Sequence, residues 1–145
     1  MGHPACGGPG ARPVPLGWRE RGRARPCRAP PHRHVRGGRL GGTGYHYVKP
    51  ANVGSTDPAR PAAVLYEGNH ETGKRELVAV EWVVPHQGQP APRIFDRPMD
   101  GPAMPPGVGD VFTLHAWICT KNPRGVFAPY DSRVRRDCPE GAPQR

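Results

Sequence analysis

Three polar side chains interrupt apolar stretches of this sequence and together could bind a metal ion. His46 lies between two tyrosines, Glu81 interrupts a Val-rich run, and His115 interrupts the most strand-like segment of the chain. Two imidazoles and one carboxylate that converge from different strands suit a divalent transition metal. Their spacing along the chain is not a metal-binding signature by itself. A shared hydrogen-bond network and independent surface positions therefore remain open as alternatives.

The sequence contains no motif for the common catalytic chemistries. Glycine-rich phosphate-binding loops, the GxSxG nucleophile elbow and the HExxH zinc motif are all absent. Ser55 and Ser132 lie in polar, turn-like segments, where serine commonly makes local hydrogen bonds. We therefore assign no catalytic residue and no site for an organic cofactor. The cofactor suggested by these residues is one divalent transition-metal ion.

The segment that would position the three side chains has the pattern of a small β domain. The chain contains 21 Pro and 20 Gly in 145 residues, which disfavours long helices and suits short strands joined by turns. Strand-like runs are expected at residues 44–48, 62–67, 76–84 and 111–119. The second and third runs flank a Gly-bounded turn and are expected to form a β-hairpin. In the third run, even-numbered residues 78–84 should share one face and odd-numbered residues 79–83 the other.

A long Pro-rich connection precedes the last predicted strand. Residues 85–110 contain seven Pro and four Gly and show little periodicity, so we expect a long loop there. After the strand, Asn122, Pro123 and Gly125 occupy positions that favour a type I turn. These patterns predict a mainly β fold, a small antiparallel sandwich or barrel with a long Pro-rich loop.

Positive charge is concentrated at the N-terminal end. Residues 1–43 contain nine Arg and one acidic residue, whereas the rest has twelve Lys or Arg against eleven Asp or Glu. We expect a disordered basic segment at 1–43, a β domain at 44–134 and a frayed tail at 135–145. Nucleic-acid binding is expected only through residues 1–43. The same segment could instead be a degenerate targeting sequence, or translated sequence upstream of, or out of frame with, the true start.

Apolar runs and cysteines bear on the location of the protein. No stretch approaches the 18 or so apolar residues of a membrane span, and no signal peptide is recognisable. The cysteines have no CxxC spacing, so neither a zinc ribbon nor a redox pair is indicated. Cys119 is expected to be a buried thiol. Cys138 could form a disulfide in an oxidising compartment, with Cys27 as the candidate partner outside the core.

Several separated motifs resemble one family of proteins. They lie at residues 44–48, 65–67, 77–82, 114–117 and 122–128. Over residues 44–134 the chain resembles a family of small bacterial proteins that is frequent in high-G+C actinobacteria and has no assigned activity. Members usually carry an export signal, so the resemblance implies an exported mature domain. It also implies that His46, Glu81 and His115 occupy motif positions.

The chain departs from that family in three places. Residues 1–43 match nothing in the family pattern. The Pro-rich stretch at 99–106 lacks the His that the family tends to carry, which removes any ligand role at that position. Cys138 is displaced from the family's terminal Cys, so a shared disulfide is in doubt.

The leading functional interpretation is a non-enzymatic, extracytoplasmic binding or structural module whose Pro-rich loop contacts a ligand or partner. The second interpretation is a metal-binding domain with a cupin-like arrangement of His46, Glu81 and His115. The third is nucleic-acid binding through the basic N-terminal arm.

Overall fold

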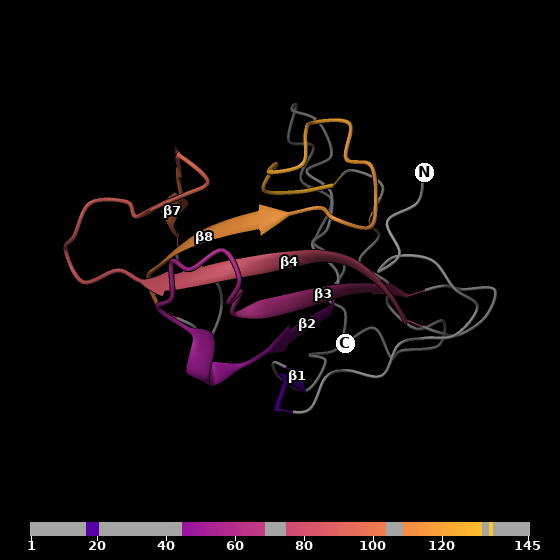
Figure 1. Ribbon diagram of the computed structural model, residues 1–145, viewed down its shortest axis with the longest axis horizontal. Helices are drawn as coiled ribbons and strands as arrows, with labels where there is room; N and C mark the ends of the chain where they lie inside the picture. Colours follow the sequence, from indigo (N-terminus) through magenta and orange to yellow (C-terminus); the bar gives the residue numbers. More distant parts are fainter. Residues whose placement is uncertain (1–16, 21–44, 69–74, 104–108, 132–133, 135–145) are drawn as a thin grey trace, which may run out of the picture.

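One antiparallel β-sheet dominates the structure. The computed structural model describes residues 17–20, 45–68, 75–103, 109–131 and 134. Six strands form the main sheet in the order β1-β2-β3-β4-β8-β7 (Figure 1). Strands β5 and β6 form a separate two-stranded sheet. The bounds are β1 Arg19–Glu20, β2 Tyr45–Val48, η1 Pro50–Asn52, β3 Ala63–Gly68, β4 Arg75–Pro85, β5 Arg93–Ile94, β6 Arg97–Pro98, β7 Asp100–Ala103 and β8 Val111–Ala116. The prediction of a mainly β, antiparallel fold is confirmed, and the sheet is open, with β1 and β7 at its edges.

Strand β1 belongs to the segment that was expected to be disordered. Arg19 and Glu20 pair with Val48 and Tyr47 of β2 and add an edge strand to the sheet. The expectation of disorder therefore does not hold at these residues. The rest of 1–43 and the tail 135–145 lie outside the described residues.

The predicted β3–β4 hairpin is confirmed, and it contains a bulge. Leu65 pairs with Ala79 and Tyr66 pairs with Leu77, so Val78 is an extra residue without a partner in β3. Such a bulge reverses which face the following side chains occupy. Val78 accordingly packs in the same cluster as Ala79, contrary to the simple alternation expected from the sequence.

The bulge also determines the position of Arg75 at the start of β4. Its guanidinium lies 3.9 Å from the centre of the Tyr45 ring and donates a hydrogen bond to the Tyr47 hydroxyl. Tyr47 also packs edge-to-face against Tyr66. This group of aromatic rings and one cation lies on the face opposite to His46, because consecutive strand residues point to opposite faces.

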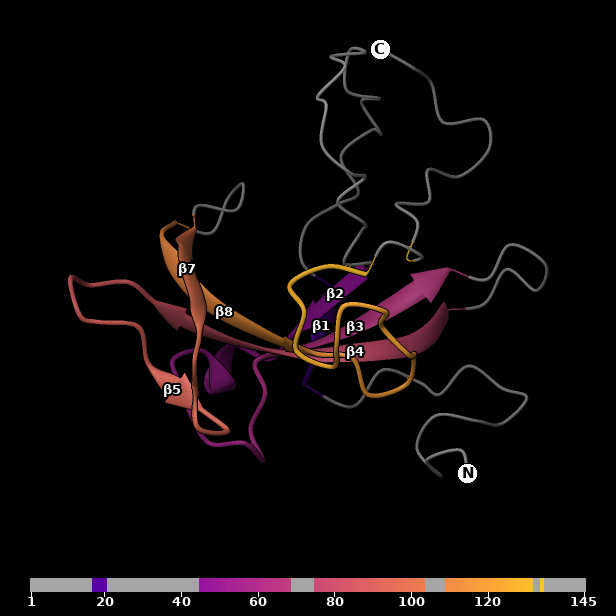
Figure 2. The ribbon, with the colours of Figure 1, turned by 90° about the horizontal axis from the view of Figure 1, so that it is seen from above.

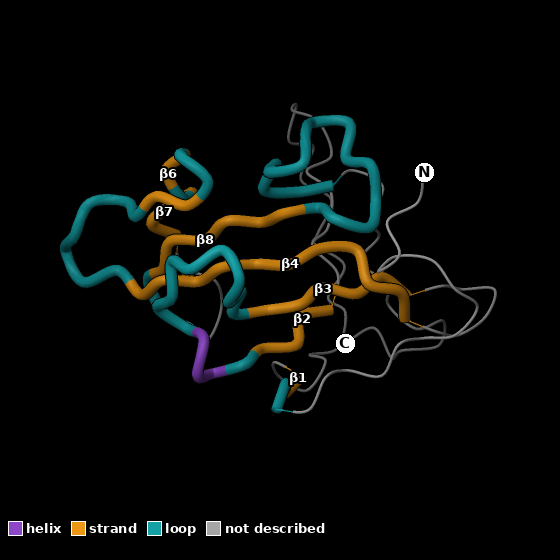
Figure 3. The backbone as a smooth tube through the Cα atoms, viewed as in Figure 1, coloured by secondary structure: helices purple, strands orange, loops and turns teal. Residues whose placement is uncertain are grey.

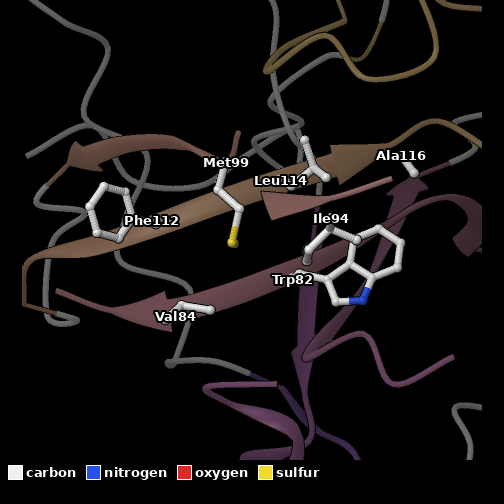
Figure 4. Close-up of a cluster of buried hydrophobic side chains, with 7 residues drawn as sticks. All are labelled: Trp82, Val84, Ile94, Met99, Phe112, Leu114 and Ala116. Carbon is white, nitrogen blue, oxygen red and sulfur yellow. The ribbon is translucent and has the colours of Figure 1, made fainter. Parts of the chain in front are cut away.

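Each face of the sheet carries its own apolar cluster. The larger cluster consists of Trp82, Val84, Ile94, Met99, Phe112, Leu114 and Ala116 (Figure 4). The opposite face carries a smaller cluster of Ala63, Leu65, Val78, Ala79, Trp117 and Val134. The alternation predicted for residues 111–117 is confirmed, because Phe112, Leu114 and Ala116 belong to the first cluster and Trp117 to the second.

The Pro-rich connection between β4 and β8 folds back on the larger cluster. Strand β7 lies beside β8 in both views (Figures 2 and 3), and in Figure 2 β5 stands away from the sheet on one side of it. Phe95 and Asp96 form the two-residue turn with positive φ angles of 52° and 57°, as a type I′ turn requires. Ile94 and Met99 on either side of this turn are buried. The segment expected to be a loop thus contributes strands and core residues, and its residues 104–108 lie outside the described part.

The segment after β8 is held by the side chain of Trp117. Its indole N–H donates to the carbonyl of Ala128 at 2.6 Å, and its backbone N–H donates to the carbonyl of Val126 at 2.8 Å. These bonds take Trp117 out of the β4 ladder, so β8 ends at Ala116 rather than at the predicted Cys119. The predicted turn that begins at Asn122 is confirmed by a hydrogen bond from the Gly125 N–H to the Asn122 carbonyl at 3.0 Å.

Cys119 differs from its expected state. It forms a disulfide rather than remaining a buried thiol, and it is only half-buried. Its partner lies outside the described residues, as do Cys27 and Cys138, so the pairing proposed for those two cysteines stays a prediction. The part of the chain that the structure describes contains no helix with the length and hydrophobicity needed to cross a bilayer.

Trp82→Ala should destabilise the domain strongly. Trp82 is 3% exposed and belongs to the larger cluster, and its indole N–H donates to the Asp57 carbonyl at 2.9 Å. We expect the free energy of unfolding, measured by urea titration, to fall by about 3–5 kcal/mol. Val53→Ala, at a 40% exposed position, is the control and should change it by less than about 0.5 kcal/mol. Similar losses in both variants would contradict the assigned core.

Candidate metal centre

His46, Glu81 and His115 come from three strands and project from the same face of the sheet. Glu81 in β4 lies directly opposite His115 in β8. On the other side of β4, Glu81 pairs with Ala63 of β3, while His46 in β2 pairs with Leu65. Cross-strand partners and alternate residues share a face, so the three polar side chains all lie above the smaller apolar cluster.

The small side chain of Ala63 lets His46 and Glu81 meet. Strand β3 lies between β2 and β4, which separates their backbones by about 9–10 Å. Ala63 is fully buried and extends no further than Cβ. The side chains of His46 and Glu81 therefore reach over β3 and bring His46 Nε2 to 3.5 Å from Glu81 Oε2.

The Glu81 carboxylate lies between the two imidazoles. Its Oε1 is 3.5 Å from His115 Nε2, while its Oε2 is the oxygen that faces His46. One potential ligand atom from each residue lies within 4.8 Å of the other two. The prediction that these three residues come together is therefore met by the geometry. Glu67, another polar residue in a predicted strand, is not part of this group.

Both Glu81–imidazole distances are longer than a charge-assisted hydrogen bond, and they involve different oxygens of the carboxylate. A charge-assisted N–H···O bond is about 2.7–2.9 Å long, clearly shorter than the 3.5 Å found here. Two atoms that each lie about 2.1 Å from a common ion are separated by about 3.0 to 3.4 Å at octahedral or tetrahedral angles. The three candidate ligand atoms lie within 4.8 Å of one another, so binding of one ion by all three requires the side chains to move closer together.

His115 is buried with no hydrogen-bond partner. Its side chain is 8% exposed, and neither ring nitrogen makes a hydrogen bond within the described structure. Desolvation by burial, and to a lesser extent the neighbouring His46, lowers the pKa of His115 from 6.5 to about 3. The imidazole is therefore neutral near pH 7 and keeps a lone pair for a metal. Its ring stacks on Trp117 with an interplanar angle of 14°.

His46 forms the more accessible side of the group. Its side chain is 23% exposed, compared with 9% for Glu81 and 8% for His115. The two imidazole rings are nearly perpendicular, at 84°, with centroids 6.5 Å apart. The group thus has a buried end at His115 and Trp117 and an end closer to solvent at His46.

The other described histidine with a polar partner lies elsewhere. His86 Nδ1 is 2.8 Å from the Asp110 carboxylate, at the junction of the end of β4 and the start of β8. Asp110 comes next to His86 through the pairing of Pro85 with Val111, which spacing along the chain does not indicate. Asp131, which is fully buried, had no signal in the sequence. His70 lies outside the described residues.

No family model, curated protein or solved structure matches the chain. The resemblance to the actinobacterial family therefore stays a prediction, and the function is argued from the geometry of the three residues.

Acidification should destabilise the metal-free protein through His115. Its pKa is about 3 in the folded state against an ordinary value of 6.5, so between these values the unfolded state binds more protons. The stabilising contribution of the neutral ring is complete above pH 6.5 and is lost as the pH falls toward 3. We expect the free energy of unfolding, measured by urea titration with a chelator present, to be lower at pH 5 than at pH 7.

His115→Gln is the matched variant for this measurement, because it keeps a polar side chain that does not titrate. Its free energy of unfolding should fall less between pH 7 and pH 5 than that of the wild type. An equal fall in the two proteins would show that His115 does not have a lowered pKa.

Proposed function

We propose that this β domain binds one divalent transition-metal ion through His46, Glu81 and His115. The observation that carries the proposal is the state of His115, which is buried against Trp117 with both ring nitrogens lacking a hydrogen bond within the described residues. An unpaired buried polar group costs about 1–3 kcal/mol. Coordination of a metal by the imidazole lone pair offsets part of this cost, and the facing carboxylate makes coordination by two residues at once possible.

Direct hydrogen bonds between Glu81 and the two imidazoles account less well for the same distances. In such a network Glu81 would accept short hydrogen bonds from both imidazoles, yet each separation is 3.5 Å. His115 is neutral because its pKa is lowered to about 3, so it brings no positive charge to the carboxylate. A divalent cation held between the three residues would interact favourably with the Glu81 carboxylate.

The donor set favours a particular class of ion. Two imidazole nitrogens and one carboxylate oxygen suit Zn²⁺, Fe²⁺, Co²⁺, Ni²⁺ or Mn²⁺, whereas Ca²⁺ and Mg²⁺ prefer oxygen ligands throughout. The ligands stand on one face of an open sheet. The proposed site is therefore cupin-like only in its donor residues, because the sheet that carries them is not a closed barrel.

The proposal predicts close to one transition-metal ion per chain. The full chain, purified without a tag or chelator, should contain that amount by elemental analysis. His46→Ala and His115→Ala should each lose most of the metal, because a site with two remaining protein ligands binds far more weakly. Circular dichroism on the same samples checks that each variant is folded.

His86→Ala is the matched control, since His86 lies outside the group and pairs with Asp110. This variant should keep its metal. A folded wild-type protein that takes up neither Zn²⁺ nor Co²⁺ in equilibrium dialysis would overturn the proposal, as would full metal retention in both His46→Ala and His115→Ala.

We also propose that the domain works outside the cytoplasm. Support comes from the disulfide of Cys119, because disulfides persist mainly in oxidising compartments. The family resemblance implies export for an independent reason. In protein recovered from its native host under alkylating conditions, non-reducing peptide mapping should find Cys119 in a disulfide-linked peptide. Recovery of alkylated Cys119 would contradict this location.

Ligand contact by the Pro-rich segment and nucleic-acid binding through residues 1–43 stay predictions. Ile94 and Met99 of the Pro-rich segment are buried in the larger cluster, which gives that segment a role in packing. Residues 1–43 are described only at 17–20.

A further inference from the structure

We propose that an ion held by His46, Glu81 and His115 keeps an exchangeable coordination position that takes a small carboxylate-type anion. This inference rests on the proposed metal site and adds what that site binds. It separates a ligand-binding centre from a purely structural one, in which protein side chains would fill every coordination position.

The number of protein donors is the first argument. The described residues supply three ligands from the three strands, and the group contains no fourth His, Cys, Asp or Glu from that part of the chain. Structural zinc sites are closed by four protein ligands, whereas sites with three keep a position for water or another small molecule. Ions that prefer octahedral geometry would keep more than one such position.

The burial of the surrounding residues indicates where the open position points. Below the three polar side chains, Ala63, Leu65 and Ala79 are all 0% exposed and form a closed apolar floor. Trp117, which is 3% exposed, closes the side next to His115. The partly exposed imidazole of His46 lies at the other side. An incoming ligand would therefore approach from the side of His46 and bind directly to the ion.

Charge determines the kind of ligand. A divalent cation with one carboxylate and two neutral imidazoles has a residual charge of about +1 in a mostly desolvated setting. Such a charge interacts with an anion more strongly than it would in bulk water. Arg75 lies on the opposite face with Tyr45 and Tyr47, so it does not compete for the anion from this side. Borderline divalent ions accept carboxylate oxygens readily, and the limits set by Trp117 and Leu65 favour a small anion.

Cobalt substitution tests this directly. The full chain is loaded with one Co²⁺ per molecule, and its visible absorption is followed during separate titrations with sodium azide and sodium acetate. We expect a saturable shift of the cobalt bands with each anion. Sodium perchlorate at the same ionic strength coordinates poorly and should produce no shift. His86→Ala, which alters a histidine outside the site, should respond as the wild type does.

The outcomes separate this inference from the proposed metal site. A chain that takes up no Co²⁺ overturns both. A chain that binds Co²⁺ stoichiometrically but shows no shift with either anion overturns the inference and leaves the metal site in place. A response to azide alone overturns the carboxylate preference. Cobalt must also stay bound during the titration, because a spectral change that follows release of the ion overturns the inference as well.

Discussion

The pairing register of β4 with β8 is the constraint on which both faces of the sheet depend. Glu81 lies opposite His115, and the next pair, Trp82 with Leu114, points to the other face. A slip of one residue in one strand would break this agreement, placing polar side chains opposite apolar ones across the ladder. Trp82 would lose its buried position, and Glu81 would no longer lie opposite His115. The packing of the larger cluster thus also holds two of the three proposed ligands in position.

The elements predicted correctly from the sequence are those determined by short-range patterns. The alternation along residues 111–117, the β3–β4 hairpin and the turn after Asn122 all depend on residues close together in the chain. The open sheet and the pairing of Arg19–Glu20 with β2 depend on contacts between distant segments, which local periodicity does not encode. The bulge at Val78 was missed because a Val-rich run gives no sign of where one residue leaves the ladder.

The candidate site shows the same division between local and distant information. His46, Glu81 and His115 were identifiable as polar residues within apolar runs. Their convergence requires β2 and β4 to flank β3, and a small residue between them at Ala63. Neither condition can be read from spacing along the chain. When both conditions are met, the site joins strands that are remote in sequence, so an ion bound there would stabilise the native strand order by an amount that grows with the logarithm of its affinity.

The extra residue at Val78 has a consequence for where positive charge can lie. Arg75 and Glu81 are both odd-numbered residues of β4, and an unbroken ladder would place them on one face. The bulge turns Arg75 to the side of Tyr45 and Tyr47, where the aromatic rings hold its guanidinium. If Val78 instead took a partner in β3, the unbroken ladder would place the fixed charge of Arg75 on the side of Glu81, where it would repel a metal ion. The bulge at Val78 therefore keeps the positive charge of Arg75 on one face of the sheet and the proposed metal ligands on the other.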